Sequence, residues 1–77
     1  MTSKQDFLVE GIVNDLALWL MQERSLSLHD SLSVIYNSQT FEKLQNPGTG
    51  LYSESSAYNY DLLISEIRNG KLVQDDF

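Results

Sequence analysis

Apolar residues recur every three or four positions along the first third of the chain, and this spacing predicts an amphipathic α-helix. The repeating positions are Leu8, Ile12, Leu16, Trp19 and Leu20, and the row is widened by Val9 and Val13. Thr2 or Ser3 can cap the start, and Asp6 lies in the first turn, where the helix dipole favours negative charge. We therefore expect a long helix over residues 4–24. Gly11 in its interior costs on the order of 1 kcal/mol relative to Ala, which suggests that another backbone passes close to it.

A second helix is predicted after the interruption at residues 25–27. Ser27 with Asp30 three residues later resembles a capping box with the shorter acid in place of Glu. The helix should begin at Leu28 and end near Asn37. One face of it carries the apolar residues Leu28, Leu32, Ile35 and Tyr36.

A short third helix follows directly, because Ser38 can cap residues 39–45. Phe41 and Leu44 should point inward from it. The stretch 46–50, Asn-Pro-Gly-Thr-Gly, is the most turn-rich in the chain, and the residue before a proline avoids helical geometry. The third helix should therefore end before this turn.

The last helix repeats apolar residues at positions i, i+3, i+4 and i+7, namely Tyr60, Leu63, Ile64 and Ile67. Three serines can cap its start: Ser53, Ser55 and Ser56. Gly70 stands where a left-handed cap would end it. Residues 71–77 are then expected to form a mobile tail.

These elements predict a single all-α domain over residues 1–77, a compact irregular bundle of four helices with the third one short. A chain of 77 residues that is 42% apolar is near the lower size limit for a self-sufficient hydrophobic core. It has no cysteine, so packing alone must stabilise the fold. The expected core residues are Leu16, Leu20, Leu32, Ile35, Leu44, Leu63 and Ile64.

The net charge of the chain limits the kinds of molecule that it can bind. Eleven acidic and five basic residues give a net charge of −6. Nucleic-acid backbones and anionic membrane surfaces would be repelled, because both are bound through clustered cations. The longest apolar run, residues 16–21, is too short to span a membrane, and no secretory leader opens the chain. We therefore expect a cytoplasmic protein that binds neither nucleic acid nor membrane.

Catalytic and ligand-binding patterns are weak in this sequence. His29 has neither a nucleophile nor metal ligands at suitable spacing, so we interpret it as an exposed residue at a helix start. Carboxylate pairs such as Glu10 with Asp15 have no apolar pocket residue between them. The turn at 46–50 lacks the leading strand and the following Lys of a phosphate-binding loop. We predict a protein that is not an enzyme, with no cofactor, no metal and no small-molecule ligand.

The first helix is apolar on most sides over residues 16–21, which is more apolar surface than one small core can cover. This predicts a second buried face at Leu18, Trp19 and Met21. Tyrosines suit the edge of such a patch, and Tyr52 and Tyr58 are its candidates, beside Tyr36 and Tyr60. The alternative is that the three shorter helices enclose the first helix completely.

Protein–protein interaction is therefore the predicted function, with homodimerisation through the first helix as the mechanism. An antitoxin-like role, in which another protein covers the same patch, is the main alternative. A helix-turn-helix DNA reader is the other, because the second and third helices meet at a tight corner. Only Gln39, Lys43 and Gln45 would serve it, and the net charge opposes it.

The middle of the chain, from about Val13 to Ile67, resembles a family of small bacterial helical proteins of unknown function. The matching segments are Ser27-Leu28-His29-Asp30-Ser31-Leu32, Tyr36-Asn37-Ser38, Leu44, Gly50-Leu51-Tyr52 and Ser56-Ala57-Tyr58. The resemblance implies the same helical layout and a cytoplasmic bacterial setting, and some members are encoded near toxin–antitoxin-like genes. The family has no established catalytic residues to carry over. This chain departs from it with Ser31 where Ala is usual, and with Leu51-Tyr52 where a Met-His or Leu-His pair is common.

Overall fold

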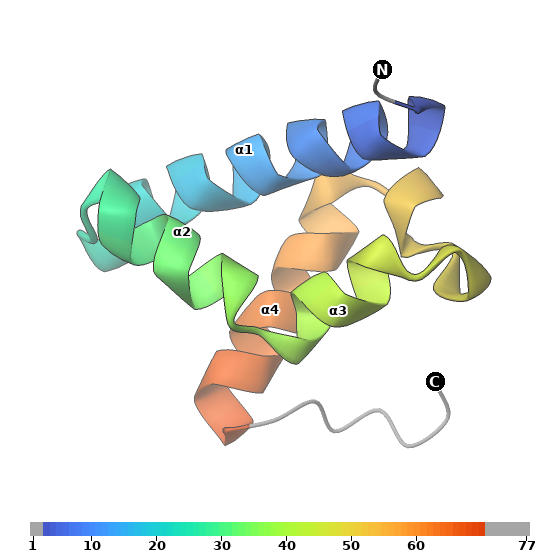
Figure 1. The fold of residues 1–77 in the computed structure, drawn as a ribbon. Coiled ribbons are helices and arrows are strands. Elements are labelled where there is room, and N and C mark those ends of the chain that lie inside the picture. The colour runs from blue at the N-terminus through green and yellow to red at the C-terminus, as the bar shows by residue number, and fades with distance from the viewer. Residues whose placement is uncertain (1–2, 71–77) are drawn as a thin grey trace.

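The computed structural model describes residues 3–70, and this part of the chain folds into four α-helices without any strand (Figure 1). The helices are α1 (Lys4–Arg24), α2 (Leu28–Tyr36), α3 (Gln39–Gln45) and α4 (Ser56–Asn69). Two short 3-10 turns, η1 (Pro47–Thr49) and η2 (Leu51–Ser53), connect α3 to α4. The predicted all-α bundle with a short third helix is confirmed. The tail predicted at 71–77 lies outside the described residues.

A serine side chain caps the start of every one of these helices, as the sequence predicts. The serine Oγ accepts a hydrogen bond from the backbone N–H three residues later in each case. The pairs are Ser3 with Asp6 at 3.1 Å, Ser27 with Asp30 at 3.0 Å, Ser38 with Phe41 at 3.0 Å and Ser55 with Tyr58 at 3.0 Å. Each cap satisfies a donor that the helix itself leaves without a partner. Gly70, at φ +76°, ends α4 in the predicted left-handed conformation.

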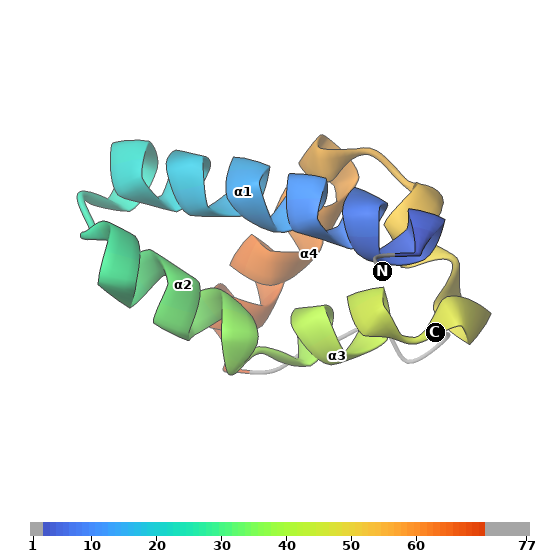
Figure 2. The same ribbon diagram turned by 45° about the horizontal axis from the view of Figure 1, so that its top comes forward.

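The helices form two levels around one core (Figures 1 and 2). α1 extends along one side, and α2 turns back beneath it before leading into α3. α4 starts beside the middle of α1, where Ser56 Oγ donates a hydrogen bond of 2.6 Å to Asp15 Oδ2. It then crosses behind α2 and α3 and packs against both α1 and α3. Three shorter elements thus cover one side of α1 and leave its opposite side to solvent.

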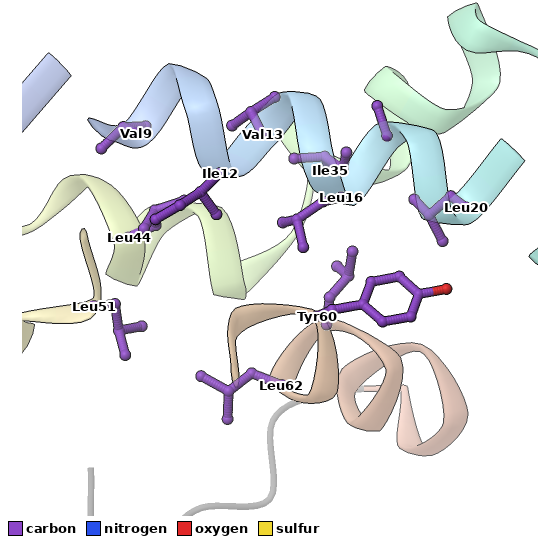
Figure 3. Close-up of a cluster of buried hydrophobic side chains, with 12 residues drawn as sticks. Val9, Ile12, Val13, Leu16, Leu20, Ile35, Leu44, Leu51, Tyr60 and Leu62 are labelled. Atoms are coloured by element: carbon purple, nitrogen blue, oxygen red, sulfur yellow. The ribbon is translucent and has the colours of Figure 1, made fainter. Parts of the chain in front are cut away.

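The core receives side chains from all four helices and from η2 (Figure 3). Its buried apolar residues are Val9, Ile12, Val13, Leu16, Ala17, Leu20, Ile35, Leu44, Leu51, Tyr60, Leu62 and Leu63. Five of the seven predicted core residues are among them. The other two, Leu32 and Ile64, are half-buried at its edge.

Three residues on the predicted apolar faces of α2 and α4 are exposed: Leu28, Tyr36 and Ile67. Each lies in a terminal turn of its helix. In α2 the buried positions are Ser31 and Ile35, so its inward face is rotated away from the row that hydrophobicity alone indicates. Spacing predicts which residues share a face, but the neighbouring helix determines how much of that face is covered.

Candidate interaction surface on the first helix

The side of α1 that faces away from the core carries two large exposed apolar side chains. Phe7 is 69% exposed and Leu18 is 50% exposed. Gly11 and Asn14, both exposed, lie between them. Spacings of four, three and four residues place all four on one helical row, which we call the outer row of α1. It lies opposite the buried residues of the same helix.

A shallow hollow of about 410 Å³ lies on this surface beside Gly11. Phe7 and Leu8 line one end of it, and Asp15 and Ser56 line the other. The hydrogen bond between Asp15 and Ser56 ties the start of α4 to the edge of the outer row. The surface is therefore shaped by two helices, and its centre is open because Gly11 has no side chain.

The predicted close approach of another backbone to Gly11 does not occur within this copy of the chain. A Cβ built at Gly11 would meet no described atom within 4 Å. Glycine in a helix interior is roughly 0.5–1 kcal/mol less favourable than alanine. The packing of the described residues therefore gives no reason for glycine at this position.

The five residues predicted to form the interaction surface divide into two groups. Leu18 and Tyr58 are exposed, at 50% and 43%. Trp19, Met21 and Tyr52 are half-buried. Trp19 and Tyr52 also pack against the hydrophobic core, so part of their surface already stabilises the bundle.

Trp19 is held in place by an aromatic contact with α4. Its ring meets the ring of Tyr60 edge to face, with centroids 5.3 Å apart and planes at 69°. The Tyr60 hydroxyl, seen in Figure 3 pointing outward from the core, donates a hydrogen bond of 3.0 Å to Glu23 Oε1. Burial raises the pKa of Tyr60, and the hydrogen bond and negative charge of Glu23 raise it further. Trp19 therefore joins α1 to α4 as well as bordering the surface.

Phe7 belongs to the exposed surface but was not among the predicted residues. The sequence places it one turn before Gly11 and three turns before Leu18, on the same row. That spacing was available from the sequence. However, α1 has apolar residues on most sides, so periodicity alone does not show which row faces outward.

The remaining candidate sites are His29 and the turn at residues 46–50. His29 is exposed in the first turn of α2, and among residues 3–70 no three His, Asp or Glu side chains gather as metal ligands would. In the turn at 46–50, the N–H groups of Gly48, Thr49 and Gly50 donate to atoms of Asn46 and Pro47. These groups are therefore already engaged within the turn.

The corner between α2 and α3 carries a carboxylate at the position where a DNA-reading helix would meet its target. Glu66 of α4 accepts hydrogen bonds from the backbone N–H of Gln39 at 2.7 Å and of Thr40 at 2.9 Å. Recognition helices approach DNA with their N-terminal residues. A negative group at this end opposes contact with phosphates.

No helix within residues 3–70 has the combination of length and apolar character that crossing a membrane requires. Comparison with models of protein families, with curated proteins and with solved structures finds no match to the chain.

Proposed function

We propose that this protein is a non-enzymatic protein–protein interaction module in a bacterial cytoplasm, and that it pairs with a second copy of itself through the outer row of α1. The observation that carries the proposal is that Phe7 and Leu18 are largely exposed on either side of a hollow at Gly11. Half-buried Leu8 and Met21 flank the row and widen its apolar area.

The residues of the outer row are spaced by four, three and four positions, and this order is the same from either end of the helix. In an antiparallel pair of α1 helices with a two-fold axis between residues 12 and 13, Phe7 faces Leu18 of the partner subunit. Gly11 then faces Asn14 of the partner subunit. A two-fold interface requires this kind of self-complementarity. Glycine at the crossing would also let the two backbones approach closely.

The charges on α1 weaken this arrangement and make it depend on salt. Glu10 and Asp15 lie on opposite edges of the outer row, because a separation of five positions corresponds to about 500° of helical rotation, or about 140° around the helix. In the antiparallel pair, Glu10 therefore lies on the edge away from Asp15 of the partner subunit, but on the same edge as Glu10 of the partner subunit. Asp15 likewise shares an edge with its own copy. The net charge of −6 on each copy opposes association at long range, so added salt should strengthen the pairing.

Sedimentation equilibrium over a wide concentration range tests the proposal. Two large apolar side chains per copy make a small interface, so the measurement should extend to millimolar protein. We expect a reversible dimer in the parent protein and a folded monomer for Leu18→Glu. Leu28→Glu is the matched control, because Leu28 is 53% exposed on α2 and lies off the outer row.

Gly11→Ala separates association from folding. The added methyl group meets nothing in this copy, so we expect the free energy of unfolding of the monomer to rise by about 0.5–1 kcal/mol. At the crossing of two helices the same methyl group would hold the backbones apart, and the dimer should weaken. Trp19 is a poor site for this test, because its contact with Tyr60 couples its replacement to folding.

Two outcomes would overturn self-pairing: a parent protein that remains monomeric at millimolar concentration, or equal weakening by Leu18→Glu and Leu28→Glu. A monomeric parent that copurifies with a stoichiometric second protein would support the antitoxin-like alternative instead.

A further inference from the structure

A second concave site lies on another side of α1, between its N-terminal half and the corner where α2 meets α3. This cleft has a volume of about 480 Å³. Figure 2 shows the N-terminal turns of α1 above α3. The residues that line the cleft come from these two helices and from Tyr36 at the end of α2. Gln5 and Gln45 close one end, where Gln5 Nε2 donates a hydrogen bond of 3.0 Å to the Gln45 carbonyl oxygen. The cleft and the hollow at Gly11 share only Asn14 among their lining residues.

The two walls of the cleft differ in chemistry. On α1, Asp6 and Glu10 are exposed and stand one turn apart, so both carboxylates border the opening. On the other wall, the rings of Tyr36 and Phe41 meet edge to face, with centroids 5.0 Å apart and planes at 81°. Tyr36 is 54% exposed. No Lys, Arg or His is among the residues that line the cleft.

We propose that this cleft binds a basic side chain, an arginine in preference to a lysine, carried by a partner polypeptide. A cation is attracted to the face of an aromatic ring within about 6 Å of its centroid. The planar guanidinium group also stacks on aromatic rings and pairs with carboxylates through two parallel hydrogen bonds. Tyr36 with Phe41 supplies the first kind of contact, and Asp6 with Glu10 supplies the second.

The charge of the whole protein favours the same ligand. A net charge of −6 concentrates cations near the surface and repels anions. Tyr36 also combines a large apolar ring with a polar hydroxyl group, which suits a residue at the edge of a binding site. A neutral apolar side chain would leave the two carboxylates without a partner, so the cleft should discriminate against it.

Amide chemical shifts measured by NMR during titration with a blocked tripeptide, acetyl-Gly-Arg-Gly-amide, test the proposal. We expect shifts confined to residues around the cleft, and binding roughly tenfold weaker when citrulline, a neutral analogue of the same shape, replaces the arginine. Asp6→Asn combined with Glu10→Gln should weaken binding by a similar factor. Tyr36→Leu should also weaken it, and circular dichroism should show that this variant is folded, because the replaced side chain is half-exposed.

The matched control is Glu54→Gln combined with Asp61→Asn, which removes the same number of charges from exposed positions outside the cleft. This variant should bind the peptide as the parent does. Equal binding of the arginine and citrulline peptides would overturn the proposal, as would equal weakening by the two double variants or the absence of shifts at millimolar peptide. Asn14 is the one residue of the outer row that also lines this cleft. None of the residues substituted in this test belongs to the outer row, so the comparison of the variants does not depend on self-association.

Discussion

The carboxylate of Glu66 is predicted to be the most important polar side chain for the stability of the bundle. It extends from α4 to the first turn of α3 and accepts three hydrogen bonds. Oε2 accepts from Gln39 N at 2.7 Å, and Oε1 accepts from Thr40 N at 2.9 Å and from Thr40 Oγ1 at 2.8 Å. A helix of seven residues is too short to be stable alone, so α3 depends on such contacts.

The expected cost of Glu66→Ala follows from burial. Thr40 is 1% exposed, so its N–H and hydroxyl groups would lose their partner without gaining water. Each buried group left unsatisfied costs about 1–3 kcal/mol. Gln39 is exposed, and water can replace the carboxylate there. We expect a total loss of about 2–6 kcal/mol for the two Thr40 groups, which is a large part of the roughly 4–11 kcal/mol expected for a domain of this size.

Urea unfolding followed by circular dichroism measures this loss. Glu66→Gln should fall between the parent and Glu66→Ala, because the amide keeps one acceptor oxygen and turns an NH₂ group toward another donor. Asp61→Ala is the matched control on α4, where the carboxylate is exposed, and it should stay within about 0.5 kcal/mol of the parent. A loss below about 1 kcal/mol for Glu66→Ala, or full stability of Glu66→Gln, would refute the reasoning.

Three further outcomes are expected. Ser31→Ala should raise the free energy of unfolding by about 1 kcal/mol, because the Ser31 hydroxyl is buried without a hydrogen-bond partner among residues 3–70. The control Ser33→Ala, at an exposed position, should raise it less. A lower free energy of unfolding for Ser31→Ala would contradict the prediction. Gly50→Ala should lower the unfolding free energy by about 1 kcal/mol in urea titration, because Gly50 has φ +70°; an unchanged midpoint would count against this. The raised pKa of Tyr60 means that the neutral phenol is favoured in the folded state, so this stabilisation is complete below the ordinary tyrosine pKa of about 10 and is lost as pH rises through the folded value. Absorbance titration should show a late tyrosinate component that Tyr60→Phe removes and Glu23→Gln shifts downward; titration of every tyrosine at the ordinary value would contradict the assignment.

The helices and their caps could be predicted from the sequence because they depend on neighbours within four residues. The spacing of Ser27 to Asp30 and the position of Ser38 directly before the third helix predict both as caps, and both accept the expected hydrogen bonds. At the start of α4, three serines satisfied the same local rule. Only the packed structure identifies Ser55 as the cap of α4, because Ser53 belongs to η2 and Ser56 is already inside α4.

The candidate surfaces were predictable only in part. An excess of apolar residues on the first helix was visible in the sequence, and Leu18 and Tyr58 are indeed exposed. Phe7 was missed, and Trp19 proves to be half-buried against Tyr60. The cleft with Asp6 and Glu10 on one wall was not predicted at all.

The sequence alone determined the helical class, the approximate helix boundaries and the caps at Ser27 and Ser38, because hydrophobic spacing and capping act over one or two turns of a single segment. The tertiary structure decided which row of α1 faces solvent, that Glu66 caps a helix 26 residues away, and that Tyr36 and Phe41 form one wall of a cleft. These features arise where segments distant in the chain pack together. Their positions depend on the relative placement of whole helices, which no local spacing rule specifies.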